Sequence, residues 1–195
     1  MSHEPKIPLS PAAPAAAWVA PATRDAMALR WSMLVCVLVL AACGPIRPTS
    51  PKVEFVIVRH AEKASDDPRD PQLSAAGMAR AQRLAASLAT APLAAIYATA
   101  YRRTRQTATP AAAAHSLTVS TYEAKSDAGE FAATLSQRHA RGTVLVVGHS
   151  NTVPAIAGAL CGCTVAPIGD DEYDRRLRVQ IDGDGKATLS DTHVP

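Results

Sequence analysis

Residues 53–63 constrain the fold of this chain more than any other stretch. Residues 53–58 are mostly β-branched or aromatic, which predicts a strand, and the run ends abruptly in the pair Arg59-His60. In an open α/β sheet, ligands bind at the carboxyl ends of the strands. A histidine there offers a nitrogen that acts as nucleophile or base, and an arginine offers paired donors for phosphate oxygens. The alternative interpretation is a strand followed by a solvated charged turn.

The chain after this stretch alternates between helical and strand patterns. Helices are predicted over residues 75–90, 102–115, 127–139 and 151–160, strands over 93–98, 117–122 and 143–147, and a closing hairpin over 177–181 and 186–189. Ser74 and Asp127 are expected to be N-caps, and Pro110 is expected to kink or restart its helix. This order predicts a three-layer α/β/α fold, with a mainly parallel sheet, helices on both faces and an antiparallel edge.

The segment before the folded part has the features of a signal peptide. Arg24 and Arg30 precede an apolar run over residues 33–42. The run ends in small residues, and Cys43 follows it directly. The run is shorter than the roughly 20 apolar residues of a transmembrane helix. Met27 would be a more usual start for such a segment than Met1, and both starts remain open.

Residues 40–44, Leu-Ala-Ala-Cys-Gly, resemble a bacterial lipobox. The resemblance implies that Cys43 receives lipid and becomes the mature N-terminus. Gly44 in place of aspartate implies the periplasmic face of the outer membrane. An uncleaved membrane anchor is the alternative. We therefore divide the chain into an extension with a lipoprotein signal peptide (1–43), a proline-rich tether (44–52) and one folded domain (53–193).

Composition narrows the function. The net charge of the 195 residues is +3, and the arginines are scattered apart from a cluster near residues 102–105, so a nucleic-acid partner is not predicted. Four cysteines are too few for a disulfide framework. We interpret Cys161 and Cys163 as replacements for small residues at a helix end, with redox chemistry as the alternative. A zinc site with His60 or His149 is disfavoured, because structural zinc needs four well-spaced ligands.

Three predicted turns carry residues suited to one anion. Each follows an apolar strand: Arg59-His60, the segment 101–108 with Arg103, and the segment 148–150 with His149. In a parallel sheet these turns meet at one edge. Two histidines and two arginines there predict a pocket for a dianionic phosphate.

These motifs make residues 53–190 resemble the histidine phosphatase superfamily, with its phosphoglycerate-mutase-like fold. Arg59-His60-Ala61 is similar to the family's first signature, and residues 73–82 to its first-helix pattern. The segment Arg-Thr-Arg-Gln-Thr-Ala, residues 103–108, resembles the second arginine motif, and residues 146–151 resemble the strand and turn that carry the second histidine. The four motifs occur in the family's order.

The resemblance implies a covalent mechanism without metal or cofactor. His60 would attack phosphorus, while Arg59, Arg103 and His149 bind the phosphoryl oxygens. The resemblance places the general acid at Glu123, and the alternatives left open are Asp127, Glu62 and Glu130. The substrate would be a small-molecule phosphomonoester or a phosphoprotein. The acceptor that fixes the tautomer of His60 is not identified by the sequence.

Two other functions compete with this one. Residues 148–152 nearly form the elbow of a serine hydrolase around Ser150, and Asp174 and His193 follow in the expected order. The second glycine of that elbow is replaced by Thr152, however, and the roles of the two arginines would be unexplained. The other alternative is a catalytically idle lipoprotein that retains the phosphate pocket.

Overall fold

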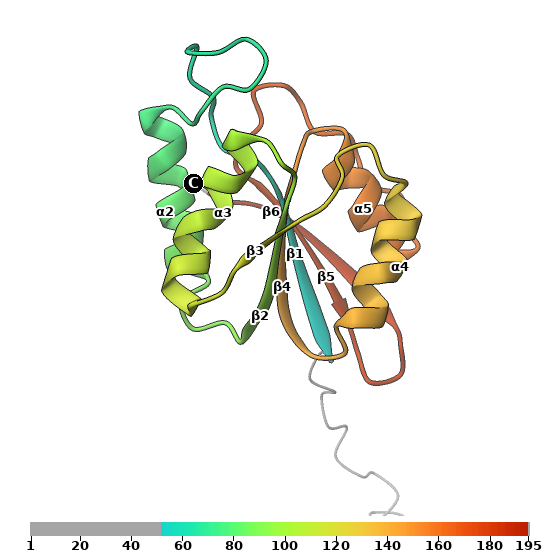
Figure 1. Ribbon diagram of the computed structural model, residues 1–195. Helices are drawn as coiled ribbons and strands as arrows, with labels where there is room; N and C mark the ends of the chain where they lie inside the picture. The colour runs from blue at the N-terminus through green and yellow to red at the C-terminus, as the bar shows by residue number, and fades with distance from the viewer. Residues whose placement is uncertain (1–51, 195) are drawn as a thin grey trace, which may run out of the picture. The chain divides into compact units, whose positions relative to one another are not determined.

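The computed structural model describes residues 52–194 (Figure 1). The predicted signal peptide, Cys43 and nearly all of the tether lie outside the described residues. The helices are α2 (Ala75–Ser87), α3 (Arg102–His115), α4 (Ala128–Arg138) and α5 (Thr152–Cys161), and the strands are β1 (Val53–Arg59), β2 (Leu93–Ala98), β3 (Val119–Thr121), β4 (Gly142–Gly148), β5 (Arg175–Ile181) and β6 (Ala187–His193). Within this part of the chain, no helix combines the length and apolar character needed to cross a membrane.

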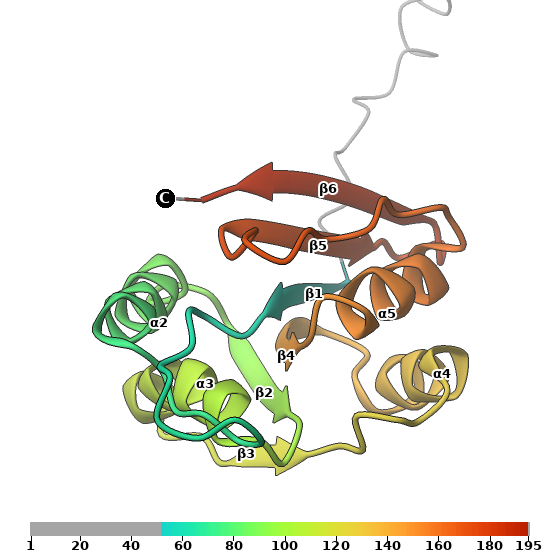
Figure 2. The same cartoon turned by 90° about the horizontal axis from the view of Figure 1, so that it is seen from above.

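The six strands form one sheet in the order β3-β2-β4-β1-β5-β6. The strands from β3 to β1 are parallel, whereas β5 and β6 pair antiparallel at one edge. Helices α2 and α3 cover one face of the sheet and α4 and α5 cover the other (Figure 2). The predicted three-layer fold with an antiparallel edge is therefore confirmed.

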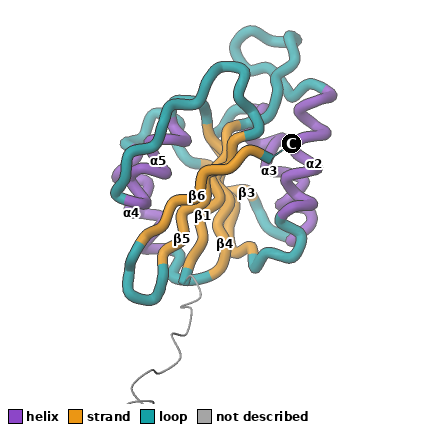
Figure 3. The backbone as a smooth tube through the Cα atoms, turned by 180° about the vertical axis from the view of Figure 1, so that it is seen from behind, coloured by secondary structure: helices purple, strands orange, loops and turns teal. Residues whose placement is uncertain are grey.

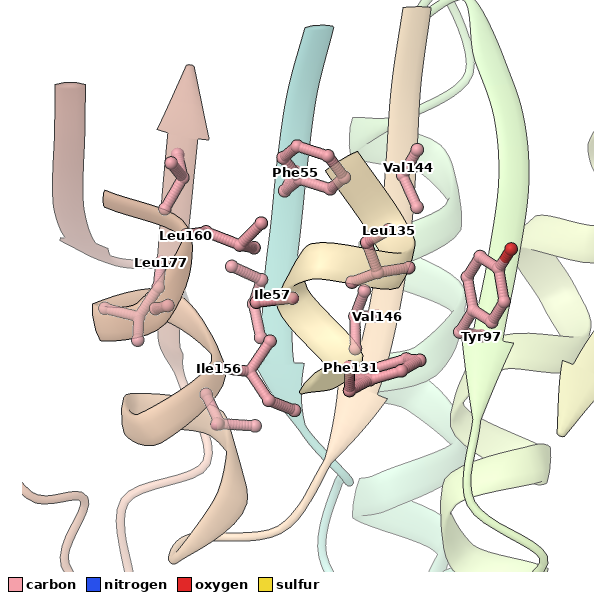
Figure 4. Packing of buried hydrophobic residues seen from close by; sticks show 14 of the residues in the cluster. Phe55, Ile57, Tyr97, Phe131, Leu135, Val144, Val146, Ile156, Leu160 and Leu177 are labelled. Atoms are coloured by element: carbon pink, nitrogen blue, oxygen red, sulfur yellow. The ribbon is translucent and has the colours of Figure 1, made fainter. Parts of the chain in front are cut away.

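The central strands bury side chains on both faces because successive residues of a strand point to opposite sides. Phe55 and Ile57 pack with residues of α4 and α5, beside Val144 and Val146 of β4 (Figure 4). The alternate residues of β1 pack with α2 and α3 instead. This double burial explains why β1 reads as a continuous apolar run in the sequence.

The predicted helix starts are confirmed. The Ser74 side chain accepts a hydrogen bond from the Gly77 backbone, and the Asp127 side chain accepts one from Glu130. Of the two outcomes expected at Pro110, a kink or a restart, the restart is wrong, because α3 runs from Arg102 to His115 with Pro110 inside it. Alanines of α3 on both sides of the proline are buried against the sheet, which holds the two halves in one helix.

The edge hairpin is longer than the pattern predicted (Figure 3). Its strands pair from Arg175 opposite His193 to Ile181 opposite Ala187. The charged residues at the ends of β5 and β6 do not alternate with apolar ones, so the sequence pattern did not predict them as strand residues. An ion pair between the two strands joins these ends. Nη2 of Arg175 lies 2.7 Å from Oδ2 of Asp191.

The interpretation of Cys161 and Cys163 as small-residue replacements needs correction. They form a disulfide at the end of α5, with their Cα atoms 5.2 Å apart. Gly162 between them has φ 63°, the left-handed conformation that glycine adopts without steric cost. This residue turns the chain back on itself, which allows two cysteines so close in sequence to meet.

Candidate active site

Strand order brings the four predicted phosphate ligands to one pocket. Arg59 at the end of β1 is in register with Gly148 at the end of β4, so His60 and His149 leave the sheet side by side. Strand β2 lies on the other side of β4 and leads into Arg103. Arg59, His60, Arg103 and His149 line one open pocket of ≈ 380 Å³.

His60 is buried and its ring has a defined tautomer. Its exposed fraction is 4%, and its backbone nitrogen donates to the carbonyl of Gly148. Nδ1 lies 2.8 Å from the backbone oxygen of Ala61. Because a carbonyl only accepts, Nδ1 carries the proton, and the lone pair on Nε2 is available. Ala61 supplies the acceptor that the sequence did not identify.

Both site histidines are neutral at physiological pH. Burial is the main cause that lowers the pKa of His60 to about 3, and the nearby charge of Arg103 adds to it. Burial and the same arginine lower the pKa of His149 to about 4. A neutral His60 is the form that can attack an electrophile.

His149 is oriented by a residue that the sequence analysis missed. Its Nε2 lies 3.0 Å from Oγ1 of Thr99, and its backbone nitrogen donates to Oγ1 of Thr152. The rings of His149 and His60 approach edge to face, with their centroids 5.4 Å apart. Thr99 directly follows β2, so the rule that drew attention to His60 and His149 would also have indicated it.

Arg59 is held in place by the loop before β5. Its Nη1 lies within hydrogen-bond distance of the backbone oxygens of Gly169, Asp170 and Glu172. The ring of Tyr173 stacks on the guanidinium, with its centroid 4.3 Å from Cζ. Tyr173 is a second residue that the sequence analysis did not place at the site.

Arg103 is held by an aromatic ring and a carboxylate. Its Cζ lies 4.3 Å from the centroid of Tyr101, and its Nη1 lies 3.6 Å from Oδ1 of Asp70. Among the described residues, neither Nε nor Nη1 of Arg103 has a hydrogen-bond partner. Arg102 is exposed and forms an ion pair with Asp66.

Glu123, the predicted general acid, lies next to the pocket but does not line it. Its side chain is exposed and lines an adjoining hollow with Tyr122. The next two residues, Ala124 and Lys125, do line the phosphate pocket, as does Lys63 on the first loop. Lys63 and the loop after residue 122 thus contribute to the rim.

The other three candidate acids have contacts of their own. Glu62 forms an ion pair with Arg80, with Oε1 2.7 Å from Nη2. Burial raises the pKa of Glu62, but the hydrogen bonds from Arg80 outweigh burial and leave this pKa below its ordinary value. A carboxyl group with a lowered pKa is ionised, so Glu62 is disfavoured as the proton donor. Asp127 caps α4, and Glu130 lies exposed in the first turn of that helix.

The residues of the serine-hydrolase alternative do not come together in one pocket. Ser150 lines the phosphate pocket, whereas Asp174 lines a different cavity. Asp174 and His193 pair with each other, with Oδ1 3.2 Å from Nδ1. The nitrogen Nε2 of His149, next to Ser150 in the sequence, pairs with Thr99. Over residues 52–194, no three His, Cys, Asp or Glu side chains form a potential metal site.

Comparisons with known proteins agree with this fold. Residues 55–124 match the model of the histidine phosphatase superfamily (branch 1). The search of curated protein sequences found no match. Among solved structures, the protein histidine phosphatase SixA complexed with tungstate is 18% identical, with a TM-score of 0.56 over 72% of this chain and 96% of that chain.

Two further structures have the same fold. A mycobacterial glucosyl-3-phosphoglycerate phosphatase is 14% identical, with a TM-score of 0.58 over 73% of this chain and 99% of that chain. Phosphoserine phosphatase from Entamoeba histolytica, in complex with 3-phosphoglyceric acid, is 13% identical, with a TM-score of 0.56 over 73% and 97%. Residues 55–124 are thus similar to the histidine phosphatase superfamily (branch 1), and the fold is the one that these phosphatase structures share.

Proposed function

We propose that this domain hydrolyses phosphomonoesters through a phosphohistidine formed on His60. One observation carries the proposal. The imidazole of His60 is neutral, and its Nδ1 donates to the backbone oxygen of Ala61, so the lone pair is on Nε2. His60 lines the same pocket as Arg59, Arg103 and His149. A neutral nucleophile beside two guanidinium groups is suited to attack on a phosphoryl group, because the cations of Arg59 and Arg103 stabilise the charge that develops on its oxygens.

The reaction proceeds in two displacements. Nε2 of His60 forms a bond to phosphorus as the bond to the leaving oxygen breaks, and that oxygen keeps the electron pair and takes a proton from a general acid. Water then attacks phosphorus and gives a proton to the conjugate base of the acid, the N–P bond breaks with its electron pair returning to Nε2, and phosphate leaves. Arg59, Arg103 and His149 hold the phosphoryl oxygens in both steps. Glu123 is the proposed acid, because the residues that follow it, Ala124 and Lys125, line the phosphate pocket.

The pocket suits a phosphate presented on a larger group. It is open and its rim carries the exposed lysines Lys63 and Lys125. The neighbouring folds include structures described as phosphatases of a protein histidine, of glucosyl-3-phosphoglycerate and of phosphoserine. We therefore propose a small-molecule phosphomonoester or a phosphoprotein as substrate. The guanidinium groups of Arg59 and Arg103 supply the positive charge in the pocket.

An aryl phosphate assay tests the activity. The parent is expected to release phosphate, and His60→Ala is expected to abolish release. His193→Ala is the matched control, because His193 is exposed at the end of β6 and should leave the rate unchanged. Brief reaction with a ³²P-labelled ester should trap an acid-labile adduct on His60.

Three results would contradict the proposal. A parent without turnover would favour the idle phosphate-binding protein. Activity that survives in His60→Ala would exclude the phosphohistidine. Inactivation by a serine-directed acylating reagent, with no effect of vanadate, would favour the hydrolase based on Ser150.

We also propose that a lipid on Cys43 anchors the domain to the periplasmic face of the outer membrane. The lipobox resemblance of residues 40–44 supports it. Cys43→Ser should move the protein from the detergent phase to the aqueous phase in a partition assay. Equal partitioning of parent and variant would exclude the anchor.

A further inference from the structure

The loop between β1 and α2, residues 60–74, is fastened to the start of α3 (Figure 1). Oδ1 of Asp70 accepts a hydrogen bond of 2.9 Å from the backbone nitrogen of Arg102. In addition, Oδ2 of Asp66 lies 3.2 Å from Nη1 of Arg102. Because Arg103 directly follows Arg102, these contacts keep Asp70 beside a residue of the phosphate pocket.

Asp70 is the carboxylate partner of Arg103. Its Oδ1 lies 3.6 Å from Nη1 of the arginine, which is longer than the roughly 2.7–3.2 Å of a hydrogen bond. The contact is therefore an interaction between charges. It offsets part of the positive charge that Arg103 offers to a ligand.

The other contacts of Arg103 do not add negative charge. Tyr101 stacks on its guanidinium, and the two pocket histidines, His60 and His149, are neutral. Over the described residues 52–194, no other carboxylate forms an ion pair with Arg103. The charge of Asp70 is therefore the one whose removal changes the ion pairing of this arginine.

We propose that Asp70, acting through Arg103, weakens the binding of phosphate in the phosphate pocket. Arg103 lines that pocket, whereas Asp70 does not. Arg103 attracts a bound anion less strongly when a carboxylate already offsets part of its charge. The side chain of Asp70 is 35% exposed, so solvent screens its charge, and the effect on the dissociation constant should be about threefold to tenfold. The inference rests on the proposed function for the place where phosphate binds.

The effect on catalysis follows from the product, which is phosphate itself. Substrate and product both present phosphoryl oxygens to Arg103, so the carboxylate weakens the binding of both. A change that acts equally on the ground state and the transition state alters KM and not the rate of the chemical step. Loss of the charge should therefore lower KM and the inhibition constant of inorganic phosphate together, without an increase in kcat.

Asp70→Asn separates the charge from the structure of the loop. The amide oxygen of asparagine can still accept the hydrogen bond from the Arg102 nitrogen, because asparagine caps helix N-termini about as well as aspartate. If Asp70 only held the loop, the variant would bind phosphate equally well or more weakly. Loss of an offsetting charge predicts the opposite result, which is tighter binding.

Equilibrium dialysis of the full chain in detergent against ³²P-labelled inorganic phosphate measures the difference. Asp70→Asn should lower the dissociation constant about threefold to tenfold at low ionic strength, and by less in about 1 M salt, which screens exposed charges. Asp70→Glu keeps the charge and should bind no more tightly than the parent. Asp66→Asn is the matched control, because Asp66 is on the same loop and pairs with Arg102 instead of Arg103. Its dissociation constant should equal that of the parent.

Unchanged or weaker binding in a folded Asp70→Asn would overturn the proposal, and so would equal tightening in Asp66→Asn or Asp70→Glu. If Asp70→Asn does not fold, Asp70→Ser replaces it with the same expected tightening, because serine is neutral and also caps helices. A parent that binds phosphate but hydrolyses no ester would refute the catalytic proposal and leave this one standing. A parent that binds no phosphate would overturn both.

Discussion

The hydroxyl of Thr99 lies 3.0 Å from Nε2 of His149, and 50 positions separate the two residues in the sequence. Thr99 is fully buried, and its hydroxyl also contacts that of Thr104 at the start of α3. The pair joins the end of β2 to the residue after β4. His149 therefore depends on the neighbouring strand for its orientation.

Thr99→Val should lower kcat about tenfold, because one net hydrogen bond contributes about 0.5–1.5 kcal/mol and 1.36 kcal/mol is a factor of ten in rate. KM should change less than kcat if Thr99 positions His149 for the transition state. Thr99→Ser keeps the hydroxyl and should restore the rate. Steady-state kinetics on an aryl phosphate measure both values, and a fully active Thr99→Val would contradict the positioning role.

Glu123→Gln should slow hydrolysis mainly for poor leaving groups. An alkoxide needs a proton as it leaves, whereas a nitrophenolate does not. We expect alkyl phosphates to lose 10²–10⁴-fold in rate, the usual range for general acid catalysis, and nitrophenyl phosphate to lose far less. Asp184→Asn, an exposed carboxylate in the turn between β5 and β6, is the control. Unchanged rates on alkyl phosphates would remove Glu123 from the mechanism.

The free energy of unfolding should fall as the pH is lowered from about 6.5 toward 4. The pKa of His60 is about 3 in the folded state and about 6.5 when unfolded, so the unfolded chain binds the additional proton in this range. At pH 5 the loss from His60 should be on the order of 2 kcal/mol. Urea unfolding at pH 7.5 and 5.0 measures it. His60→Gln should reduce this loss, and an identical slope in the variant would contradict the burial of a neutral imidazole.

Gly148→Ala should destabilise the domain by about 1–3 kcal/mol. An added Cβ would lie 2.7 Å from Oη of Tyr122 and 2.8 Å from Oγ1 of Thr152, where packing leaves no room. Gly183→Ala in the hairpin turn is the control, because its Cβ would meet no atom within 4 Å. Thermal unfolding compares the two variants. Equal stability of both would show that the end of β4 adjusts easily.

Loss of the disulfide should cost little stability. Cross-linking residues two positions apart closes a very small loop, and the chain-entropy model gives about 1–2 kcal/mol for it. The double variant Cys161→Ser/Cys163→Ser should therefore unfold only slightly earlier in urea. Dithiothreitol should shift the parent to the same midpoint and leave the variant unchanged. A loss of more than about 4 kcal/mol would show that the bond holds more structure than its own turn.

The sequence alone was sufficient for the order of helices and strands and for the prediction that Arg59, His60, Arg103 and His149 meet in one pocket. Apolar runs such as residues 143–147 and capping residues such as Ser74 depend on local chemistry, so they can be read without a fold. Arg59, His60 and His149 lie at or directly after the end of an apolar strand, and Arg103 lies in the first turn of the helix that follows one, so the rule for strand ends was enough to group them.

Tertiary structure decided the contacts between residues distant in sequence. The position of Thr99 behind His149, the stacking of Tyr173 on Arg59 and the position of Glu123 outside the pocket follow from which strands are neighbours and how the loops pack. Local patterns determine what each segment becomes, but hydrogen bonds and unpaired charges depend on the partners that packing supplies.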